Sequence, residues 1–227
     1  MIVLTGASGG IGGRMIPDLL ELDQVIGLFS KSMAECSKSE GLSFERVDLT
    51  QREQIRDFVK RRKSHLKHLT VLHFATTSID GLAMNYEESD WDQVMSVNLK
   101  GAFLLTQALL PVMIQEKWGR IIHISSCVGL SGVPGTMAYS ASKTGLMGMS
   151  RTLSKEYGRF GITSNLLSLG YFEAGLIDTL SDEMRKKILA QIPSKKFGKI
   201  NSITNAVRFL VASDYMNGAI INLDGGI

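Results

Sequence analysis

Cysteine is scarce in this chain, which has Cys36 and Cys127 and no others among its 227 residues. Two cysteines give neither the ligand spacing of a metal site nor the count of a disulfide framework, so we expect no bound metal. The scarcity favours a reducing compartment and predicts a cytoplasmic protein. The chain also lacks an internal linker, a repeat or a low-complexity tract, so we expect a single domain over residues 1–227.

A strong excess of one charge is missing as well. The 25 lysines and arginines against 22 acidic residues give a net charge of +3, which does not indicate a nucleic-acid partner. The densest basic cluster, residues 60–63, closes a predicted helix, where cations suit the negative end of the dipole. No apolar run approaches the ~18 residues of a transmembrane span. Residues 1–4 predict a strand rather than a signal peptide, so we expect no membrane partner either.

What the sequence does contain is an alternation of strand-like and helix-like segments within an ordinary globular composition, 44% apolar and 21% charged. Expected strands cover residues 2–4, 25–30, 44–49, 70–75, 121–124, 162–168 and 219–223. Expected helices cover residues 11–22, 51–63, 91–110, 136–157 and 204–212. The alternation predicts an α/β protein built on a doubly wound parallel sheet with helices on both faces.

A glycine-rich turn follows the first expected strand and leads directly into the first expected helix. Gly6, Gly10 and Gly12 are its defining positions. Glycines let the backbone approach a pyrophosphate, and a helix N-terminus offers free N–H groups and a positive dipole. Strand, glycine turn and helix in this order predict a dinucleotide-binding site.

The end of the second expected strand bears on the choice of cofactor, because it meets the adenosine ribose in such folds. Ser30, Lys31 and Ser32 stand there, with no carboxylate before Glu35. Hydroxyls and a lysine accommodate a 2′-phosphate, which favours NADPH over NADH. The alternative is that this loop is merely exposed and carries no information about the cofactor.

Tyr139 and Lys143 are four residues apart on the long expected helix, so they lie one turn from each other on one face. A nearby ammonium favours phenolate over phenol and lowers the pKa of the tyrosine. With hydroxyls at the end of the preceding strand, the pair is a candidate proton-transfer device. Taken alone, the pair is better explained as an ordinary half-buried tyrosine and a solvated lysine.

Two other segments admit two interpretations. Asn98 falls inside an expected helix, where asparagine is a mediocre residue, and we interpret it as a tolerated surface residue in preference to a local irregularity serving a site. Residues 170–198 form a long, mostly polar stretch between a strand and a helix, which is typical of a substrate lid. The apolar Leu176, Ile177 and Leu180 within it suggest a lipophilic or acyl substrate, or are ordinary core.

Taken together, these motifs resemble the short-chain dehydrogenase/reductase family, and the resemblance spans essentially the whole chain. The matching pieces occur in the family's order: Thr5-Gly6-x-x-x-Gly10-x-Gly12, Asp48-Leu49, Asn98, Ser126, Tyr139-x-x-x-Lys143 and the closing residues 218–226. The resemblance implies a single-domain Rossmann-type fold and a nicotinamide-dependent oxidoreductase.

The same resemblance implies roles for individual residues. Tyr139 would be the general acid, Ser126 would orient the carbonyl, and Lys143 would lower the pKa of Tyr139 and bind the nicotinamide ribose. Asn98 would anchor a water in a proton relay. The expected cofactor-binding residues are Thr5, Gly6, Ser8, Gly9, Gly10, Ile11, Gly12, Ser30, Lys31, Asp48, Leu49, Ala75, Thr76, Tyr139, Lys143 and Gly170.

The chain departs from the family pattern in three places. His73-Phe74-Ala75-Thr76 stands where the family has Asn-Asn-Ala-Gly, and only the alanine is shared. Leu169-Gly170 replaces Pro-Gly, and Ala174 replaces a threonine that touches the carboxamide. These replacements alter contacts beside the cofactor ribose and in the lid, and leave the proton-transfer residues intact.

Within the family, the chain looks most like 3-oxoacyl-(acyl-carrier-protein) reductases, which reduce a β-ketone on a thioester carried by an acidic protein. Lys117, Arg120 and Arg159 are expected near the site, where they could receive that carrier. The alternatives are an NAD-dependent dehydrogenase of a sugar, steroid or secondary alcohol, and a non-catalytic nucleotide-binding relative. The family also implies a homo-oligomer, a dimer or tetramer, with the helices around Asn98 and Tyr139 at the interface.

Overall fold

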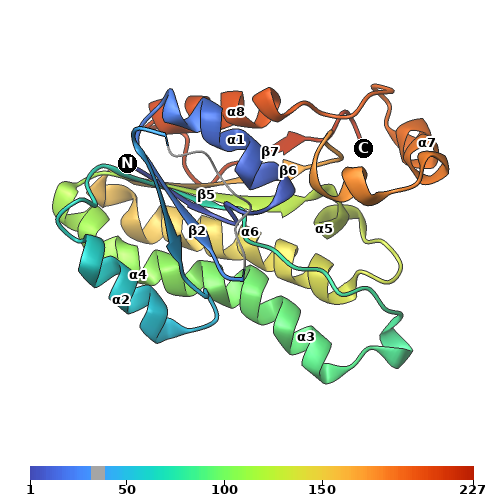
Figure 1. The fold of residues 1–227 in the computed structure, drawn as a ribbon, viewed down its shortest axis with the longest axis horizontal. Helices are drawn as coiled ribbons and strands as arrows, with labels where there is room; N and C mark the ends of the chain where they lie inside the picture. Colours follow the sequence, from blue (N-terminus) through green and yellow to red (C-terminus); the bar gives the residue numbers. More distant parts are fainter. Residues whose placement is uncertain (32–38) are drawn as a thin grey trace.

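A seven-stranded parallel sheet forms the centre of the molecule, in the order β3-β2-β1-β4-β5-β6-β7 (Figure 1). The computed structural model describes residues 1–31 and 39–227, so Ser32, Glu35 and Cys36 lie outside the described residues. The strands are β1 (Ile2–Thr5), β2 (Val25–Phe29), β3 (Leu42–Arg46), β4 (Leu69–His73), β5 (Gly119–Ser126), β6 (Ile162–Leu169) and β7 (Ile220–Leu223). The sequence prediction of a doubly wound, Rossmann-type parallel sheet is confirmed.

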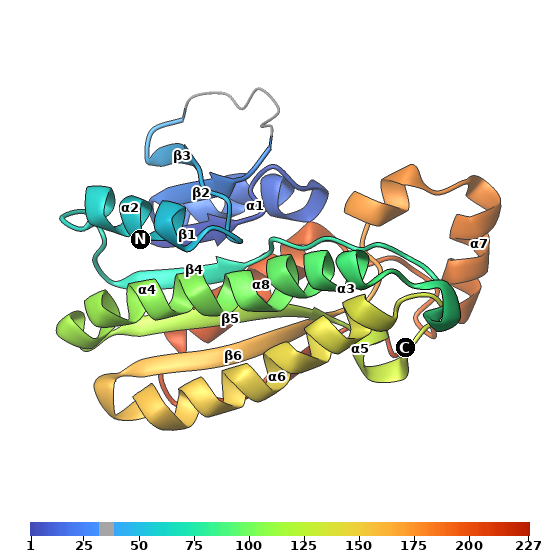
Figure 2. The same ribbon diagram turned by 90° about the horizontal axis from the view of Figure 1, so that it is seen from below.

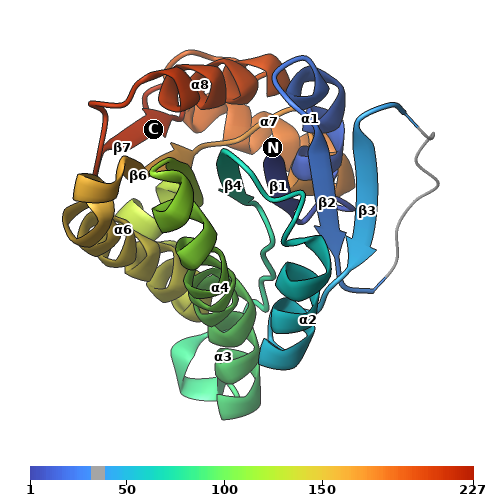
Figure 3. The same ribbon diagram turned by 90° about the vertical axis from the view of Figure 1, so that its left-hand side faces the viewer.

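The helices cover both faces of this sheet. α1 and α8 lie on one face, and α2, α4 and α6 lie on the other (Figures 2 and 3). The α-helices are α1 (Gly10–Leu20), α2 (Arg52–Arg62), α3 (Glu88–Met95), α4 (Gly101–Glu116), α5 (Cys127–Ser131), α6 (Met137–Tyr157), α7 (Asp182–Gln191) and α8 (Ile200–Ala212). Shorter helical turns are η1 (Ala83–Asn85), η2 (Ser96–Lys100), η3 (Gly158–Phe160) and η4 (Gly175–Thr179).

Two apolar cores hold the layers together. On one face Met15 and Leu19 of α1 and Val207 of α8 are fully buried against the sheet. On the other face Phe58 of α2 and Leu105 of α4 are equally buried. Because the sheet is covered on both faces, its central strands are nearly continuous runs of apolar residues in the sequence, as is usual for parallel strands.

The order of the strands indicates where a ligand would bind. The chain moves outward from β1 to β2 and β3, then crosses back over β1 to β4. In open parallel sheets, ligands bind outside the carboxyl ends of the strands at such a reversal point. Here the reversal lies between β1 and β4, next to the glycine turn that follows Thr5.

The long central helix predicted over residues 91–110 is longer and less regular than expected. It begins at Glu88, ends at Glu116 and contains a π-helical turn, η2, between α3 and α4. By length and composition the stretch Glu88–Glu116 could cross a membrane, but 56% of its most apolar window is buried inside the protein. α4 packs on the sheet, so we assign this apolar character to the core.

Candidate active site

The four expected catalytic residues come together at the carboxyl edge of the sheet, although they stand far apart in the sequence. Ser126 is the last residue of β5, and Tyr139 and Lys143 lie in the first turns of α6. Asn98 lies in η2 and packs beside α6. β5, η2 and α6 therefore gather all four side chains at the carboxyl edge of the sheet.

The Ser126 hydroxyl lies beside the phenol of Tyr139. Its Oγ accepts a hydrogen bond from the N–H of Val128 at 3.3 Å, which caps the short helix α5. Ser125 instead donates its hydroxyl to the Lys143 carbonyl at 3.1 Å and is buried. Of the two serines, Ser126 is thus the one whose hydroxyl faces the candidate site.

The pKa of Tyr139 differs from the sequence expectation. Burial raises the pKa of this phenol, and a side-chain hydrogen bond with Ser126 opposes that increase without reversing it. Desolvation of the phenol therefore dominates in the protein as described. The expected lowering of this pKa by Lys143 stays a prediction.

Lys143 is a buried ammonium, 2% exposed. Its Nζ donates to the Ile124 carbonyl at 2.8 Å and lies 5.5 Å from the ring centroid of Tyr139. It makes no ion pair among the described residues. Burial lowers the pKa of Lys143 from 10.5 to about 8, so the side chain remains mostly charged at neutral pH.

Asn98 is buried, so its interpretation as a tolerated surface residue is wrong and the local irregularity is correct. Its Oδ1 accepts from the Thr77 N–H at 2.8 Å, and its Nδ2 donates to the Thr77 carbonyl at 2.9 Å and to Ser142 Oγ at 3.0 Å. Ser142 in turn donates to the Tyr139 carbonyl at 2.7 Å. The side-chain amide ties the loop after β4 to α6 with both of its protons, and the part of Asn98 in a proton relay stays a prediction.

The glycine turn has the backbone shape of an anion site. Gly6 has a φ of 69°, and a Cβ on it would lie 2.8 Å from the N of Ala75. Gly9 occupies the N-cap of α1 without a side-chain hydrogen bond, so the first N–H groups of the helix are not capped by a side chain. A Cβ at Gly10 would lie 2.5 Å from the Cα of Gly175, so this turn and the segment after β6 meet closely. These features fit a bound pyrophosphate.

The residues around this turn hold it against β4. Thr5 Oγ1 donates to the Leu72 carbonyl at 3.3 Å and accepts from the Ala75 N–H at 2.9 Å. Phe74 turns its side chain into the core beside α1, and Thr76 is exposed at the crevice. The altered His73–Thr76 segment thus keeps its backbone anchored to the glycine turn.

An arginine that the sequence analysis missed lies at the expected ribose end. Arg46 is the last residue of β3 and pairs in register with Phe29, and its Nε donates to the Ser30 carbonyl at 2.9 Å. Ser30 and the exposed Lys31 stand beside it. Arg46 reaches this position through the parallel register of β2 and β3. In the sequence, its place two residues before Asp48, an expected cofactor residue, was a signal that could have found it.

The remaining expected cofactor residues occupy varied environments. Asp48 uses Oδ1 to accept from the N–H of Thr50 at 2.9 Å and from its hydroxyl at 2.8 Å. Leu49 is buried in the core. A Cβ on Gly170 would lie 2.7 Å from the Cα of Asp224, so the closing segment accounts for this glycine. Ser8 is exposed beside the turn, and Ile11 packs partly into the core with α1.

Two buried histidines lie under the catalytic residues. His73 and His123 are register partners on β4 and β5, and their rings stack with centroids 4.9 Å apart. His73 Nε2 bonds Thr106 Oγ1 at 2.9 Å, whereas the other three ring nitrogens have no partner among the described residues. Burial, with a contribution from the Lys143 charge, lowers the pKa of His73 to about 3 and that of His123 well below its usual value. Both rings are therefore neutral.

The expected carrier-binding cations are not near this site within one chain. Lys117 precedes β5 and Arg159 precedes β6, so both lie at the amino edge of the sheet. Arg120 is buried, stacks over Trp118 and donates to the Val211, Gly119 and Gly161 carbonyls. About 20 Å of strand, at ~3.3 Å per residue, separates Arg120 from the carboxyl edge.

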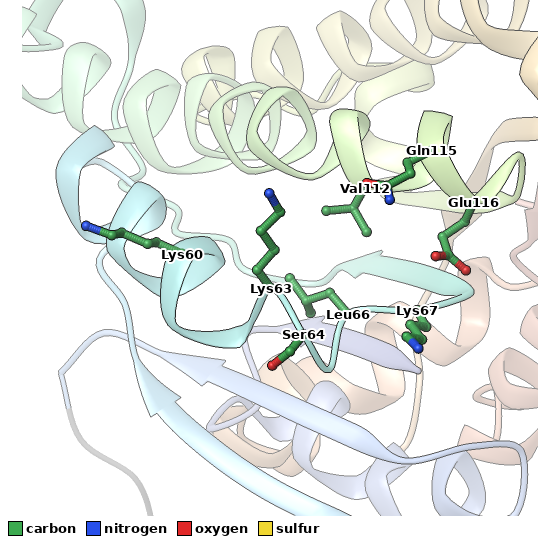
Figure 4. A pocket seen from close by; sticks show the side chains of 8 residues that line it. All are labelled: Lys60, Lys63, Ser64, Leu66, Lys67, Val112, Gln115 and Glu116. Carbon is green, nitrogen blue, oxygen red and sulfur yellow. The ribbon is translucent and has the colours of Figure 1, made fainter.

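A pocket of about 450 Å³ also lies at the amino edge (Figure 4). It is lined by Lys60, Lys63, Ser64, Leu66, Lys67, Val112, Gln115 and Glu116. These residues belong to the ends of α2 and α4 and to the segment that enters β4. The pocket is therefore separate from the crevice that holds Ser126 and Tyr139.

Comparison with known proteins decides the family. The model of the short chain dehydrogenase family matches residues 1–185. The chain belongs to the short-chain dehydrogenase/reductase family. As a member of this family it is an oxidoreductase that uses a nicotinamide cofactor, as the resemblance of its motifs predicted.

Curated relatives of this short-chain dehydrogenase/reductase match over nearly its whole length. A 3-oxoacyl-[acyl-carrier-protein] reductase of Rickettsia conorii is 36% identical, covering 99% of this chain and 95% of the relative. A reductase of the same name from Thermotoga maritima is 34% identical over 99% of this chain and 96% of its own. Nodulation protein G of a Rhizobium species is 32% identical, with 99% and 95% covered.

Proposed function

We propose that this protein reduces the ketone of a 3-oxoacyl thioester on an acyl carrier protein to an alcohol, using NADPH. The observation that carries the proposal is the pair of hydroxyls, Ser126 and Tyr139, at the carboxyl edge of the sheet, where the glycine turn after β1 also lies. The names of the 3-oxoacyl-[acyl-carrier-protein] reductases among its relatives supply the substrate class.

The chain's own residues suggest how the reaction proceeds. A nicotinamide cofactor held by the glycine turn would supply the hydride for the carbonyl carbon. The hydroxyls of Ser126 and Tyr139 hold the carbonyl oxygen, and Tyr139 donates its proton to that oxygen. Because burial raises the pKa of Tyr139, the phenol stays protonated until substrate arrives. The Lys143 ammonium, 5.5 Å from the ring, stabilises the phenolate that remains.

Replacing Tyr139 by phenylalanine tests this assignment directly. We expect kcat for a free β-keto thioester to fall by at least ~100-fold, because general-acid catalysis contributes that much. Binding of NADPH, followed by its fluorescence, should persist because the glycine turn is untouched. The matched control is Tyr157→Phe at the other end of α6, which should keep its activity. Near-normal turnover by Tyr139→Phe would refute the mechanism.

The preference for NADPH rests on the cations at the ribose end. Lys31 and Arg46 stand beside the end of β2, and a guanidinium binds phosphate well. We expect Lys31→Asp and Arg46→Ser each to lower the ratio of kcat/KM for NADPH over NADH by about tenfold. Lys67→Asp at the amino edge is the charge-matched control. An unchanged ratio in both variants would remove the 2′-phosphate from the proposal.

We also propose a homo-oligomer located in the cytoplasm. A groove of about 700 Å³ runs along α3, η2, α4 and α6, and its apolar lining includes Met95, Leu99, Phe103 and Met149. Phe103 is 43% exposed there. Exposed aromatic surface of this kind marks interaction sites. The free, buried thiol of Cys127 fits a reducing compartment.

A further inference from the structure

One segment near the end of the chain is strongly basic and contains no acidic residue. Residues 184–199 contain six of the 25 lysines and arginines and no carboxylate. Since the whole chain carries +3, the other 211 residues together carry −3. No acidic residue occurs between Glu183 and Asp214.

This basic segment lies at the carboxyl edge of the sheet. It comprises most of α7 and the return to α8, and Figures 1 and 2 both show α7 standing beyond the strand ends, near α5. The return is fixed there by contacts with the closing residues and with the segment after β6. Ser194 N–H donates to the Gly225 carbonyl at 3.1 Å, and Phe172 bridges to Gly198. The segment therefore borders the crevice that holds Tyr139.

Three of its six cations have free charged groups. Lys186, Lys196 and Lys199 are exposed and make no ion pair or hydrogen bond through their ammonium groups with the described residues. The other three are engaged locally: Lys187 pairs with Glu183 at 2.7 Å, Lys195 donates to the Ala190 carbonyl at 2.6 Å, and Arg185 lies over the Phe197 ring.

The second basic surface of the chain is poorly placed for the same task. Lys60, Lys63 and Lys67 surround the pocket at the amino edge, together with the carboxylate of Glu116 (Figure 4). That surface lies at the opposite end of the strands from Ser126. A substrate tethered to a partner there would have to span the length of the sheet.

We propose that Lys186, Lys196 and Lys199 form the docking surface for an acidic protein that carries the substrate as a thioester. This rests on the proposed function, because it assigns the carrier of that substrate a place on the chain. Opposite charges beside the crevice steer the carrier toward it and raise the association rate, an effect that salt screens. The chemistry at Ser126 and Tyr139 does not involve these three lysines.

The test compares one reaction with two substrates. A triple variant, K186E/K196E/K199E, is assayed with a β-keto acyl group on an acyl carrier protein and with a free β-keto thioester of similar acyl chain. We expect kcat/KM for the carrier-bound substrate to fall by about tenfold or more at low salt, mostly through KM, and the difference to shrink at high salt. The free thioester should be reduced as by the unmodified protein.

Matched variants fix the meaning of the result. K60E/K63E/K67E reverses the same number of charges at the amino edge and should leave both substrates unaffected. Replacing Lys186, Lys196 and Lys199 by glutamine should give a smaller loss in the same direction, and covers the case in which the glutamate variant fails to fold.

The results that would contradict the docking surface differ from the result that would contradict the proposed function. An equal loss for both substrates, or an equal effect of K60E/K63E/K67E, would overturn the docking surface. A larger loss of kcat/KM for the carrier-bound substrate from K117E/R159E than from K186E/K196E/K199E would also overturn it. If the unmodified protein reduces neither thioester, the proposed function itself fails, and the docking surface falls with it.

Discussion

At the scale of single residues, the buried histidines are the most unusual feature near the site. His73 and His123 occupy adjacent positions on two central strands, under a lysine that is itself buried. Three of their four ring nitrogens lack a partner among the described residues. A protonated ring there would lie in a dry core beside the Lys143 ammonium, so the fold requires both rings to be neutral.

This requirement makes the stability depend on pH. In the unfolded chain a histidine binds a proton below pH 6.5, whereas the pKa of native His73 is lowered to about 3. As pH falls from 6.5 toward 3, the unfolded state binds more protons and the free energy of unfolding decreases. We expect a loss of about 1.4 kcal/mol per pH unit for each histidine, measured by urea unfolding from pH 8 to 4.

Comparison with variants separates this effect from the carboxylates, which also titrate in acid. The difference in unfolding free energy between the unmodified protein and His73→Asn/His123→Val should shrink as pH falls. Replacing exposed His65 by asparagine should leave the pH dependence unchanged. Parallel pH curves for the unmodified protein and the double variant would contradict the expectation.

At the scale of elements, the glycine turn and the segment after β6 are joined more closely than any motif indicates. Gly10 at the start of α1 touches Gly175 at the start of η4. Arg14, one turn further along α1, donates to the Glu173 carbonyl and to Asp178, each at 2.7 Å. We interpret residues 170–198 as a lid. Its first part, residues 173–178, rests on α1 beside the glycine turn where we expect the pyrophosphate.

Gly10→Ala probes this contact. The added Cβ would lie 2.5 Å from backbone of the lid, so either α1 or η4 must shift. We expect the KM for NADPH to rise by about tenfold and amide exchange over residues 173–182 to accelerate, with the fold retained. Gly148→Ala, where no atom lies within 4 Å, should instead stabilise α6 by about 0.5–1 kcal/mol. Unchanged exchange in Gly10→Ala would show that the lid does not depend on this contact.

Most of the element pattern could be predicted from the sequence, because apolar periodicity and turn residues are local signals. The alternation of strands and helices gave the parallel sheet, and the expected helix over residues 136–157 matches α6 (Met137–Tyr157). The π-helical turn at Ser96–Lys100 left one weak signal, the asparagine at position 98, which we interpreted as a surface residue. It depends on the amide of Asn98 reaching Thr77 and Ser142, and those partners are known only once the fold is known.

The features of the site that could not be predicted correctly from the sequence share a cause. Arg46 reaches Ser30 through strand register, and Lys117, Arg120 and Arg159 lie at the amino edge because β5 and β6 begin after them. Neither fact follows from spacing along the chain. The raised pKa of Tyr139 likewise reflects burial, which a pair of residues four apart cannot reveal.

At the scale of the whole molecule, the apolar groove along η2, α4 and α6 is the surface that we propose for the contact between copies of the chain. We expect light scattering to find a dimer or tetramer, and Phe103→Lys to lower the mass, because it places a charge in the groove. Met84→Lys, at an 87% exposed position on η1, is the control and should not change the mass. A monomeric unmodified protein at high concentration would refute the proposed oligomer.

The hydrogen bonds of Asn98 have a consequence for the order of folding. Its partners Thr77 and Ser142 lie 21 and 44 residues away, on either side of it in the sequence. The amide is satisfied only after the loop beyond β4 and the start of α6 have both docked, and contacts between distant segments form slowly. We therefore expect Tyr139 to reach its final position only once both of these segments have docked.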